Sequence, residues 1–116
     1  MAAPNLVSVT SVLPVTVDLA LTNSAADLIA AVTSSHVYFV GPLFAANKTA
    51  AAHPVTLYHK KGGTSYEQAY QWVVPANASI ALYDGARFWL PDGESLTALS
   101  DGSSQIVITG CYLDFS

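Results

Sequence analysis

The amino-acid sequence predicts an all-β protein, an antiparallel β-sandwich or jelly-roll-like single domain of about seven to nine short strands. Three observations support this prediction. Apolar and polar residues alternate along several short runs, which is the period of a half-buried strand. Gly, Pro and Asp-Gly pairs separate these runs, and such residues favour the tight turns of antiparallel sheets. No run of about 11 or more residues repeats apolar side chains at helical spacing.

The N-terminal residues form the first predicted element. Asn5–Thr10 alternates weakly between apolar and polar residues and lies between Pro4 and Pro14. Proline lacks a backbone donor and is excluded from central strands. We therefore expect residues 1–12 to be an extended N-terminal arm or an edge strand, and residues 13–116 to form the β-sandwich domain.

Three further elements are predicted in the first half of the chain. Val15–Thr22 alternates with period two and presents one apolar face, which predicts a half-buried strand. Asp27–Val32 is short and rich in alanine, and it is equally compatible with a helical turn or a strand. His36–Ala46 is the most apolar run. It is predicted to be a covered central strand with a bulge or kink at Gly41-Pro42.

The remaining residues predict a hairpin and a group of closing strands. Pro54–Lys60 and Ser65–Val74 alternate on either side of a hairpin turn at residues 61–63. The closing strands are expected at Ser79–Tyr83, Arg87–Leu90, Ser95–Leu99 and Gln105–Phe115. Asp-Gly pairs, which tolerate the positive φ angles of tight turns and therefore predict turns, occur between these runs at residues 84–85, 92–93 and 101–102.

The composition indicates a subunit of an assembly. Charged residues make up 10% of the 116 residues and hydrophobic residues 52%, whereas a typical globular domain has about 25% charged residues. A small domain with so few charges exposes uncharged patches, and such patches commonly mark interfaces.

The same composition argues against two classes of partner. The net charge is −4 with only four basic residues, which disfavours nucleic-acid binding and excludes a polybasic membrane patch. No apolar run reaches the roughly 20 residues of a membrane helix. The N-terminus resembles no secretory signal, so we expect folding in the cytoplasm.

No catalytic constellation is recognisable, and we expect no enzymatic activity, cofactor or metal. His36, His53 and His59 do not have zinc-ligand spacing. Cys111, the single cysteine, lies in a β-branched run and is expected to be a buried, unreactive thiol. The acidic residues of the C-terminal turns lack calcium-loop spacing and are interpreted as turn residues; they are Asp84, Asp92, Glu94 and Asp101.

Several segments resemble small virion structural proteins of tailed bacteriophages, in particular those of cyanobacterial hosts. They are MAAPNLVSVT, DLALTNSAADLIA, a hairpin with GGTSY, VPANASIALYD, LPDGESLTALSDGSS and ITGCYLDFS. The resemblance implies a non-enzymatic β-sandwich of the virion. Its implied role is that of a capsid decoration, or cement, protein at the capsid surface. The implied partners are the major capsid protein and copies of itself, as a homotrimer.

Two alternative roles remain open. One is a neck-, tail- or fibre-associated virion protein, and the other is a carbohydrate-binding β-sandwich module. The expected interface combines the N-terminal arm, which can add a strand to a neighbour, with the aromatic face of Ser65–Val74. For those aromatic side chains, packing in the core or at an interface is favoured over a sugar platform. The candidate interface residues are Asn5, Leu6, Val7, Val9, Tyr66, Tyr70 and Trp72.

Overall fold

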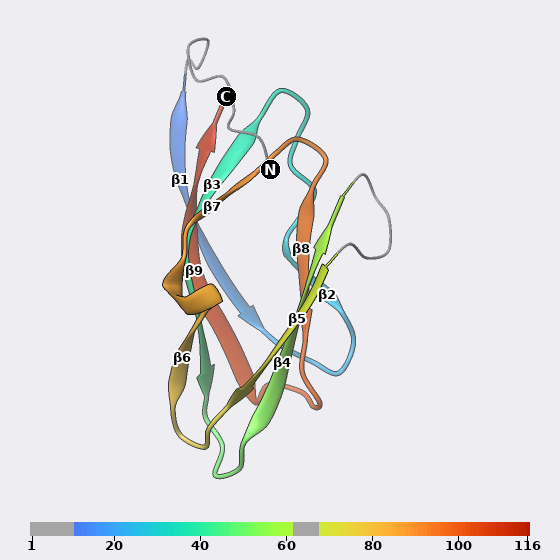
Figure 1. Ribbon diagram of the computed structural model, residues 1–116, viewed down its shortest axis with the longest axis vertical. Helices are drawn as coiled ribbons and strands as arrows, with labels where there is room; N and C mark the ends of the chain where they lie inside the picture. Colours follow the sequence, from blue (N-terminus) through green and yellow to red (C-terminus); the bar gives the residue numbers. More distant parts are fainter. Residues whose placement is uncertain (1–10, 62–67) are drawn as a thin grey trace.

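The computed structural model describes residues 11–61 and 68–116, which form nine strands and one 3-10 turn. The elements are β1 (Val12–Ala20), β2 (Ala26–Ile29), β3 (Val37–Asn47), β4 (His53–Lys60), β5 (Gln68–Val74), β6 (Ser79–Leu82), η1 (Tyr83–Gly85), β7 (Phe88–Leu90), β8 (Ser95–Leu99) and β9 (Ile106–Phe115). The strands run along the long axis of the molecule (Figure 1).

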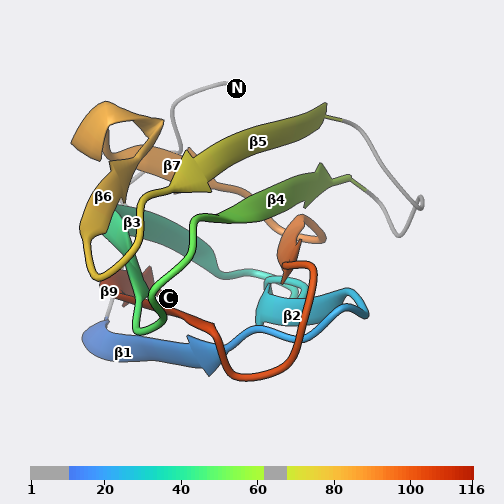
Figure 2. The same cartoon turned by 90° about the horizontal axis from the view of Figure 1, so that it is seen from below.

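The strands form two antiparallel sheets. One has the order β1-β9-β3-β6, with β7 also paired to β3, and the other has the order β2-β8-β4-β5. Because β6 and β7 pair with successive parts of β3, each sheet has four strand positions. Two such layers are the arrangement of a jelly roll, and Figure 2 shows them end on, with β1 and β2 along one side and β5 and β6 along the other. The predicted fold class is confirmed.

The core lies between the two sheets. In β4, Val55 and Leu57 are fully buried, while the alternate residues Thr56 and Tyr58 are only partly covered. This is the alternation that an antiparallel sheet with one covered face requires. The large side chains with almost no exposure are Leu21, Val40, Leu43, Val55, Leu57, Val74, Leu82, Leu90, Leu96, Ile106 and Ile108.

A β-bulge interrupts the central strand β3, as predicted. Val40 pairs with Tyr112 and Leu43 pairs with Gly110, so one extra residue of β3 lies opposite β9 at Gly41-Pro42. On its other side, β3 pairs with β7 before the bulge and with β6 after it. Pro42 therefore lies where neither β6 nor β7 is paired to β3, so its missing N–H is tolerated there.

Most predicted strands are present, with two informative differences. The ambiguous segment Asp27–Val32 contributes to a strand, β2, which pairs with β8. The first strand begins at Val12 and not at Val15, because it is an edge strand that pairs only with β9 and so tolerates Pro14. The β4–β5 hairpin is confirmed, while the residues of its predicted turn after Lys61 lie outside the described ranges.

The predicted N-terminal arm lies almost entirely outside the described residues. Of residues 1–12, only Ser11 and Val12 are described. Val12 begins β1, and the backbone N–H groups of Ser11 and Ser116 each donate to the carbonyl of the other at 2.9 Å. The role of residues 1–10 stays a prediction.

Two of the three Asp-Gly turns have the expected conformation. Gly85 and Gly93 have φ angles of 76° and 83°. The third pair also lies in a bend between strands, but there the left-handed residue is Ser104, with φ 59°, and not Gly102. There the backbone N–H of Ser104 donates to the carbonyl of Leu21 at 2.9 Å. Contact with the β1–β2 connection therefore shapes this loop more than its own Asp-Gly pair does.

Candidate interaction surface

The outer face of the five-stranded sheet is the main candidate site. Directly paired residues of antiparallel strands share a face, and Val17 and Ile108 mark the buried one. The outer face is therefore formed, among the described residues, by Val12, Pro14, Thr16, Asp18 and Ala20 of β1, Val37, Phe39, Phe44 and Ala46 of β3, Ser79 and Ala81 of β6, Trp89 of β7, and Val107, Thr109, Cys111, Leu113 and Phe115 of β9.

This outer face is unusually apolar for the exposed side of an antiparallel sheet, which is normally polar. Asp18 is the only charged residue in the set of described residues just named. Large hydrophobic side chains are exposed to solvent: Val12 is 50% exposed, Phe44 45% and Leu113 36%. Apolar surface that is gathered in this way marks an interaction site more often than single exposed apolar residues do.

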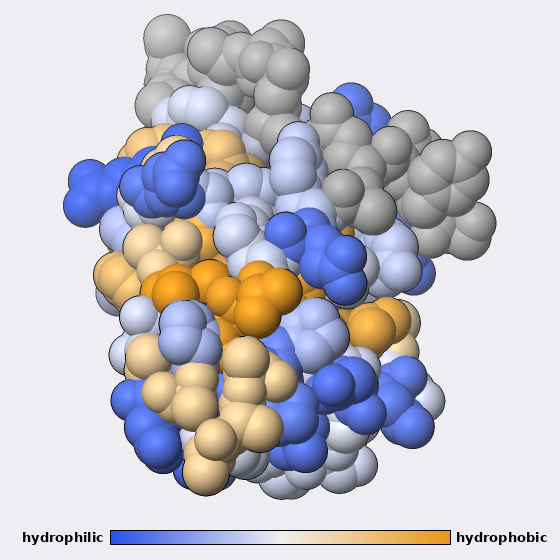
Figure 3. All heavy atoms as spheres, turned by 60° about the horizontal axis from the view of Figure 1, so that its bottom comes forward, coloured by the Kyte–Doolittle hydropathy of each residue, from blue (hydrophilic) through white to orange (hydrophobic). Residues whose placement is uncertain are grey.

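Aromatic rings reinforce one end of the outer face. The ring of Trp89 lies between those of Phe39 and Phe115, with centroid distances of 4.5 Å and 5.6 Å. These rings come from three strands, β7, β3 and β9. In the view of Figure 3, which brings the lower end of Figure 1 forward, strongly hydrophobic residues gather in a central patch with hydrophilic residues beside it.

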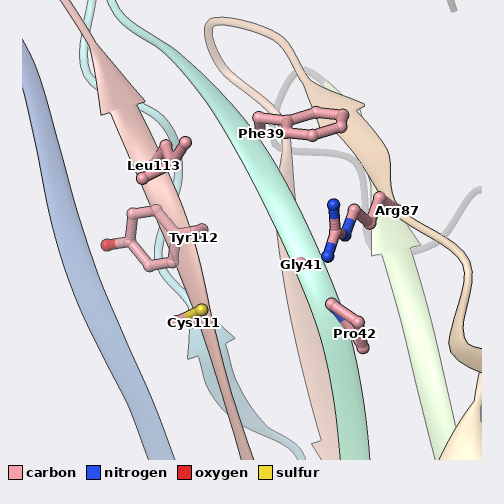
Figure 4. Close-up of a pocket in the computed structure, with 7 residues that line it drawn as sticks. All are labelled: Phe39, Gly41, Pro42, Arg87, Cys111, Tyr112 and Leu113. Carbon is pink, nitrogen blue, oxygen red and sulfur yellow. The ribbon is translucent and has the colours of Figure 1, made fainter.

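A hollow of about 240 Å³ lies beside the bulge. Figure 4 shows its lining side chains on β9, on β3, and at Arg87, whose guanidinium points toward β3. At Gly41 the backbones of β3 and β9 approach closely beside the hollow, because a Cβ there would lie 3.1 Å from the carbonyl oxygen of Cys111. The lining residues are Phe39, Gly41, Pro42, Arg87, Cys111, Tyr112 and Leu113.

Cys111 is exposed, so the prediction of a buried thiol is wrong. Its position follows from the register: Cys111 pairs with Thr16 on the outer face, whereas Gly110 pairs with the buried Val17. A single β-branched run is compatible with either assignment, because shifting a strand by one residue exchanges its two faces.

Two unpaired charges border the outer face. Asp18 lies on the edge strand β1, and Arg87 lies just before β7 near the opposite edge. Both side chains are exposed, and neither has a salt-bridge or hydrogen-bond partner within residues 11–61 and 68–116. Each charge is therefore available to a second molecule.

A cluster of aromatic rings closes the opening between β5 and β6. Tyr83 is at its centre, with ring centroids of Tyr70, Trp72 and Phe88 at 5.0, 5.1 and 5.3 Å. Burial, with a smaller contribution from Tyr70, raises the pKa of Tyr83 to about 12.

The backbone at this cluster is strained. Tyr83 and Asp84 have φ angles of 52° and 54°, and this left-handed conformation costs a residue with a Cβ about 1–2 kcal/mol. The packing of the Tyr83 ring against the core offsets that cost. A second tyrosine, Tyr112, has its pKa raised by burial and by Tyr38, onto whose ring it stacks at 4.4 Å.

The candidate interface residues from the sequence are only partly described. Tyr70 is 38% exposed, while Trp72 is partly buried and packs against the core. Asn5, Leu6, Val7, Val9 and Tyr66 lie outside the described residues. An interface role for all seven stays a prediction.

Each of the three histidines pairs with a carboxylate. His36 Nδ1 lies 2.7 Å from Asp114 Oδ1, His53 Nδ1 lies 2.9 Å from Asp101 Oδ1, and His59 Nε2 lies 2.5 Å from Glu94 Oε1. Within the described ranges no group of three or more potential metal ligands is assembled. Glu94 and the turn residue Asp101 therefore cross-link the fold through their histidine partners.

Sequence reasoning identified the aromatic side of β5 but missed the outer face of the five-stranded sheet. The available signal was Gln105–Phe115, in which Ile106, Val107 and Ile108 occupy both faces of the strand. A strand that is apolar on both faces was expected only at the centre of the fold. Its outer side is in fact exposed, and the register with β1 was needed to reveal this. No helix in the described part of the chain is long and apolar enough to cross a membrane.

No protein-family model and no curated protein matches the chain. Among solved structures, the chain is similar to one of the Bacillus endospore appendages, a family of disulfide-linked pili. The TM-score is 0.61 at 19% sequence identity, over 100% of this chain and 96% of that one. This similarity shows a shared fold.

Two viral structures are more distantly similar. One is the virus-like particle of the extra small virus of the prawn Macrobrachium rosenbergii, with TM-score 0.46 and 13% identity over 97% of this chain and 86% of that one. The other is a pentameric capsid protein from metagenomic phage sequences, with TM-score 0.36 and 18% identity over 84% of this chain and 60% of that one. The similar structures thus include β proteins of a pilus and of viral capsids.

Proposed function

We propose that this protein is a non-enzymatic structural subunit of a bacteriophage virion, and specifically a capsid decoration protein. It binds the outer capsid surface as an oligomer and stabilises the shell. Its partners are the major capsid protein and further copies of itself. It folds in the host cytoplasm and acts at the surface of the particle.

The observation that carries this proposal is the apolar outer face of the five-stranded sheet. The face exposes Val12, Phe44 and Leu113 and includes one charged residue, Asp18, among the described positions. Removing apolar area from water stabilises an assembly by about 25 cal/mol per Å². A subunit that presents such a face is therefore more stable when the face is covered.

Decoration also agrees with the form of the chain. A jelly roll has a complete core of its own, so the subunit folds before it attaches. Each contact with a repeating shell can then be weak, because attachment at several points multiplies the individual affinities. In the five-stranded sheet, β9 is hydrogen-bonded to β1 on one side and to β3 on the other. The outer face around β9 is therefore rigid.

The N-terminal arm is proposed as a second attachment. Backbone hydrogen bonds between Ser11 and Ser116 fix the start of β1 at the end of β9. The residues Asn5, Leu6, Val7 and Val9 supply alternating side chains for strand addition to a neighbour. The trimer and the cement role at the capsid rest on the resemblance of the sequence segments.

The carbohydrate-binding alternative is less well supported. A sugar platform needs exposed aromatic faces, and Trp72 has its ring against Tyr83 at 5.1 Å and near Tyr70 at 6.1 Å. Tyr70 is the most exposed of these three, at 38%. The ring contacts favour closure of the sandwich over sugar stacking.

The test is to add the purified protein to undecorated phage shells and measure co-sedimentation and the melting temperature of the shells. Binding with a raised melting temperature is expected. Leu113→Glu, on the outer face, should weaken both effects at least about tenfold in affinity, because it buries an unpaired charge. Val73→Glu introduces the same charge at a 64% exposed apolar residue of the other sheet and should bind normally. Shells that neither bind the protein nor become more stable would overturn the proposal.

A further inference from the structure

We infer that the outer face of the five-stranded sheet is an interface between two copies of this chain, packed face to face about a twofold axis that runs along the strands. This inference goes beyond the proposed function, because it assigns the outer face to the contact between copies of the chain and gives a dimer where the resemblance of the sequence segments implies a trimer. It rests on the positions of the two unpaired charges, Asp18 and Arg87, which border the exposed apolar residues of this sheet on opposite sides.

The two charges lie near opposite edges of the sheet, and their positions along the strand direction differ by only about two residues. Asp18 on the edge strand β1 pairs with Thr109, which in turn pairs with Phe44 of β3. Arg87 lines the hollow together with Pro42. Phe44 is two residues beyond Pro42, so the two levels differ by about 7 Å at a rise of roughly 3.3 Å per residue. The side chain of an arginine can span much of that difference.

A twofold axis along the strands brings these charges together. The axis lies between the two packed sheets. It places the β1 edge of one copy opposite the β6–β7 edge of the other. Asp18 of each copy then stands opposite Arg87 of its partner, and the contact forms twice because a twofold interface is self-complementary. A twofold axis perpendicular to the strands would instead place the β1 edge of one copy over the β1 edge of the other. Asp18 would then lie far from Arg87 of the partner.

The surface between the two charges is suited to burial. Sheets that pack face to face lie about 10 Å apart, and their side chains interdigitate. Phe44 is 45% exposed and follows the hollow residue Pro42 by two positions in the chain. Its paired residue, Thr109, and the hollow residue Cys111 are successive outer residues of β9. The ring of Phe44 in one copy thus has a concave apolar surface available in the other.

A second copy accounts for the charges better than the other candidate occupants. The arm segment MAAPNLVSVT has no charged residue, so it cannot pair with Asp18 or Arg87. A foreign surface would need both a cation and an anion at the matching positions. The chain itself supplies both, on the two borders of one apolar face.

The experiment is a charge-reversal cycle read by sedimentation equilibrium. The wild-type chain is expected at twice its monomer mass of 12.2 kDa. Asp18→Arg and Arg87→Asp each create two like-charge contacts per dimer, and each should raise the dissociation constant of the dimer at least about tenfold. The double variant Asp18→Arg/Arg87→Asp restores opposite charges and should recover most of the wild-type affinity.

Matched controls separate this interface from net-charge effects. Asp27→Arg and Lys60→Asp make the same changes of charge on β2 and β4 of the four-stranded sheet, away from the outer face, and should leave dimerisation unchanged. A monomer, a trimer, or a dimer that is indifferent to both single reversals would overturn the inference, as would a double variant that fails to recover. Failure here leaves shell binding, the test of the proposed function, to be judged independently.

Discussion

Gly110 of β9 lies directly against Leu43 of β3. A Cβ at residue 110 would stand 2.7 Å from Leu43 Cδ2 and 2.8 Å from the carbonyl oxygen of Pro42. Both distances are shorter than a carbon contact allows, so glycine is required where the bulge brings the two backbones together.

Replacing Gly110 by alanine is therefore expected to lower the free energy of unfolding by about 1–3 kcal/mol, the usual cost of overpacking. The side chain of Leu43 can move, but the carbonyl of Pro42 is held by the bulge. Urea denaturation measures the change. Thr109→Ala, at the exposed neighbouring residue, is the control and should change the free energy by less than about 0.5 kcal/mol. A Gly110→Ala protein as stable as wild type would show that the bulge relaxes freely.

The pair His59–Glu94 is expected to stabilise the fold more than the other histidine pairs. Its side chains are 10% and 14% exposed, so removal of the imidazole leaves a desolvated carboxylate without its partner. His59→Ala should lower the free energy of unfolding by about 2 kcal/mol or more.

The matched comparison is His53→Ala, because its partner Asp101 is 50% exposed and can be solvated by water. The loss there should be below about 1 kcal/mol. Thermal denaturation of the two variants side by side tests this ranking, and equal losses would contradict it.

Tyr83 is expected to make stability depend on alkaline pH. Its pKa is about 12 in the folded protein against 10.0 in an unfolded chain. Below about pH 10 both states hold the proton and this contribution is fully present. Between about pH 10 and 12 the unfolded state releases its proton first, so the free energy of unfolding falls as pH rises.

Spectroscopic titration of phenolate absorbance should accordingly reveal a step near pH 12 that is lost in Tyr83→Phe, while Tyr112, whose pKa is also raised, still titrates late in that variant. The alkaline fall in stability should also become less steep in that variant. If its stability-against-pH curve is superimposable on that of wild type, another group is responsible.

Thr97 offers a stabilising substitution. It is 2% exposed, and its hydroxyl has no hydrogen-bond partner among the described residues. Thr97→Val keeps the shape of the side chain and removes the unsatisfied oxygen, which should raise the free energy of unfolding by about 1 kcal/mol. Thr56→Val makes the same substitution at a partly exposed residue of the same sheet. It measures the effect of replacing threonine by valine in a strand where no buried hydroxyl is removed. A lower melting temperature for Thr97→Val than for wild type would indicate that the hydroxyl is bonded.

The alternation of residues in Val15–Thr22 and Pro54–Lys60 was sufficient to predict strands and their buried faces, because a period of two is a local property. The bulge at Gly41-Pro42 could also be predicted, since glycine and proline limit the backbone at their own positions. The choice between helix and strand at Asp27–Val32 could not, because pairing with β8 decides it. The outer face of the five-stranded sheet could not be predicted either, because it depends on register, and the interface role of Tyr70 and Trp72 stays a prediction.

The sequence by itself thus determined the fold class, the central strand with its bulge, and the scarcity of charge that indicates an assembly. These follow from composition and from local backbone preferences. Only the tertiary structure decided that Cys111, Leu113 and Phe44 face outward together, and that Asp18 and Arg87 border them. A face is defined by the register between β1, β9 and β3, and register depends on contacts between residues that are far apart in the chain.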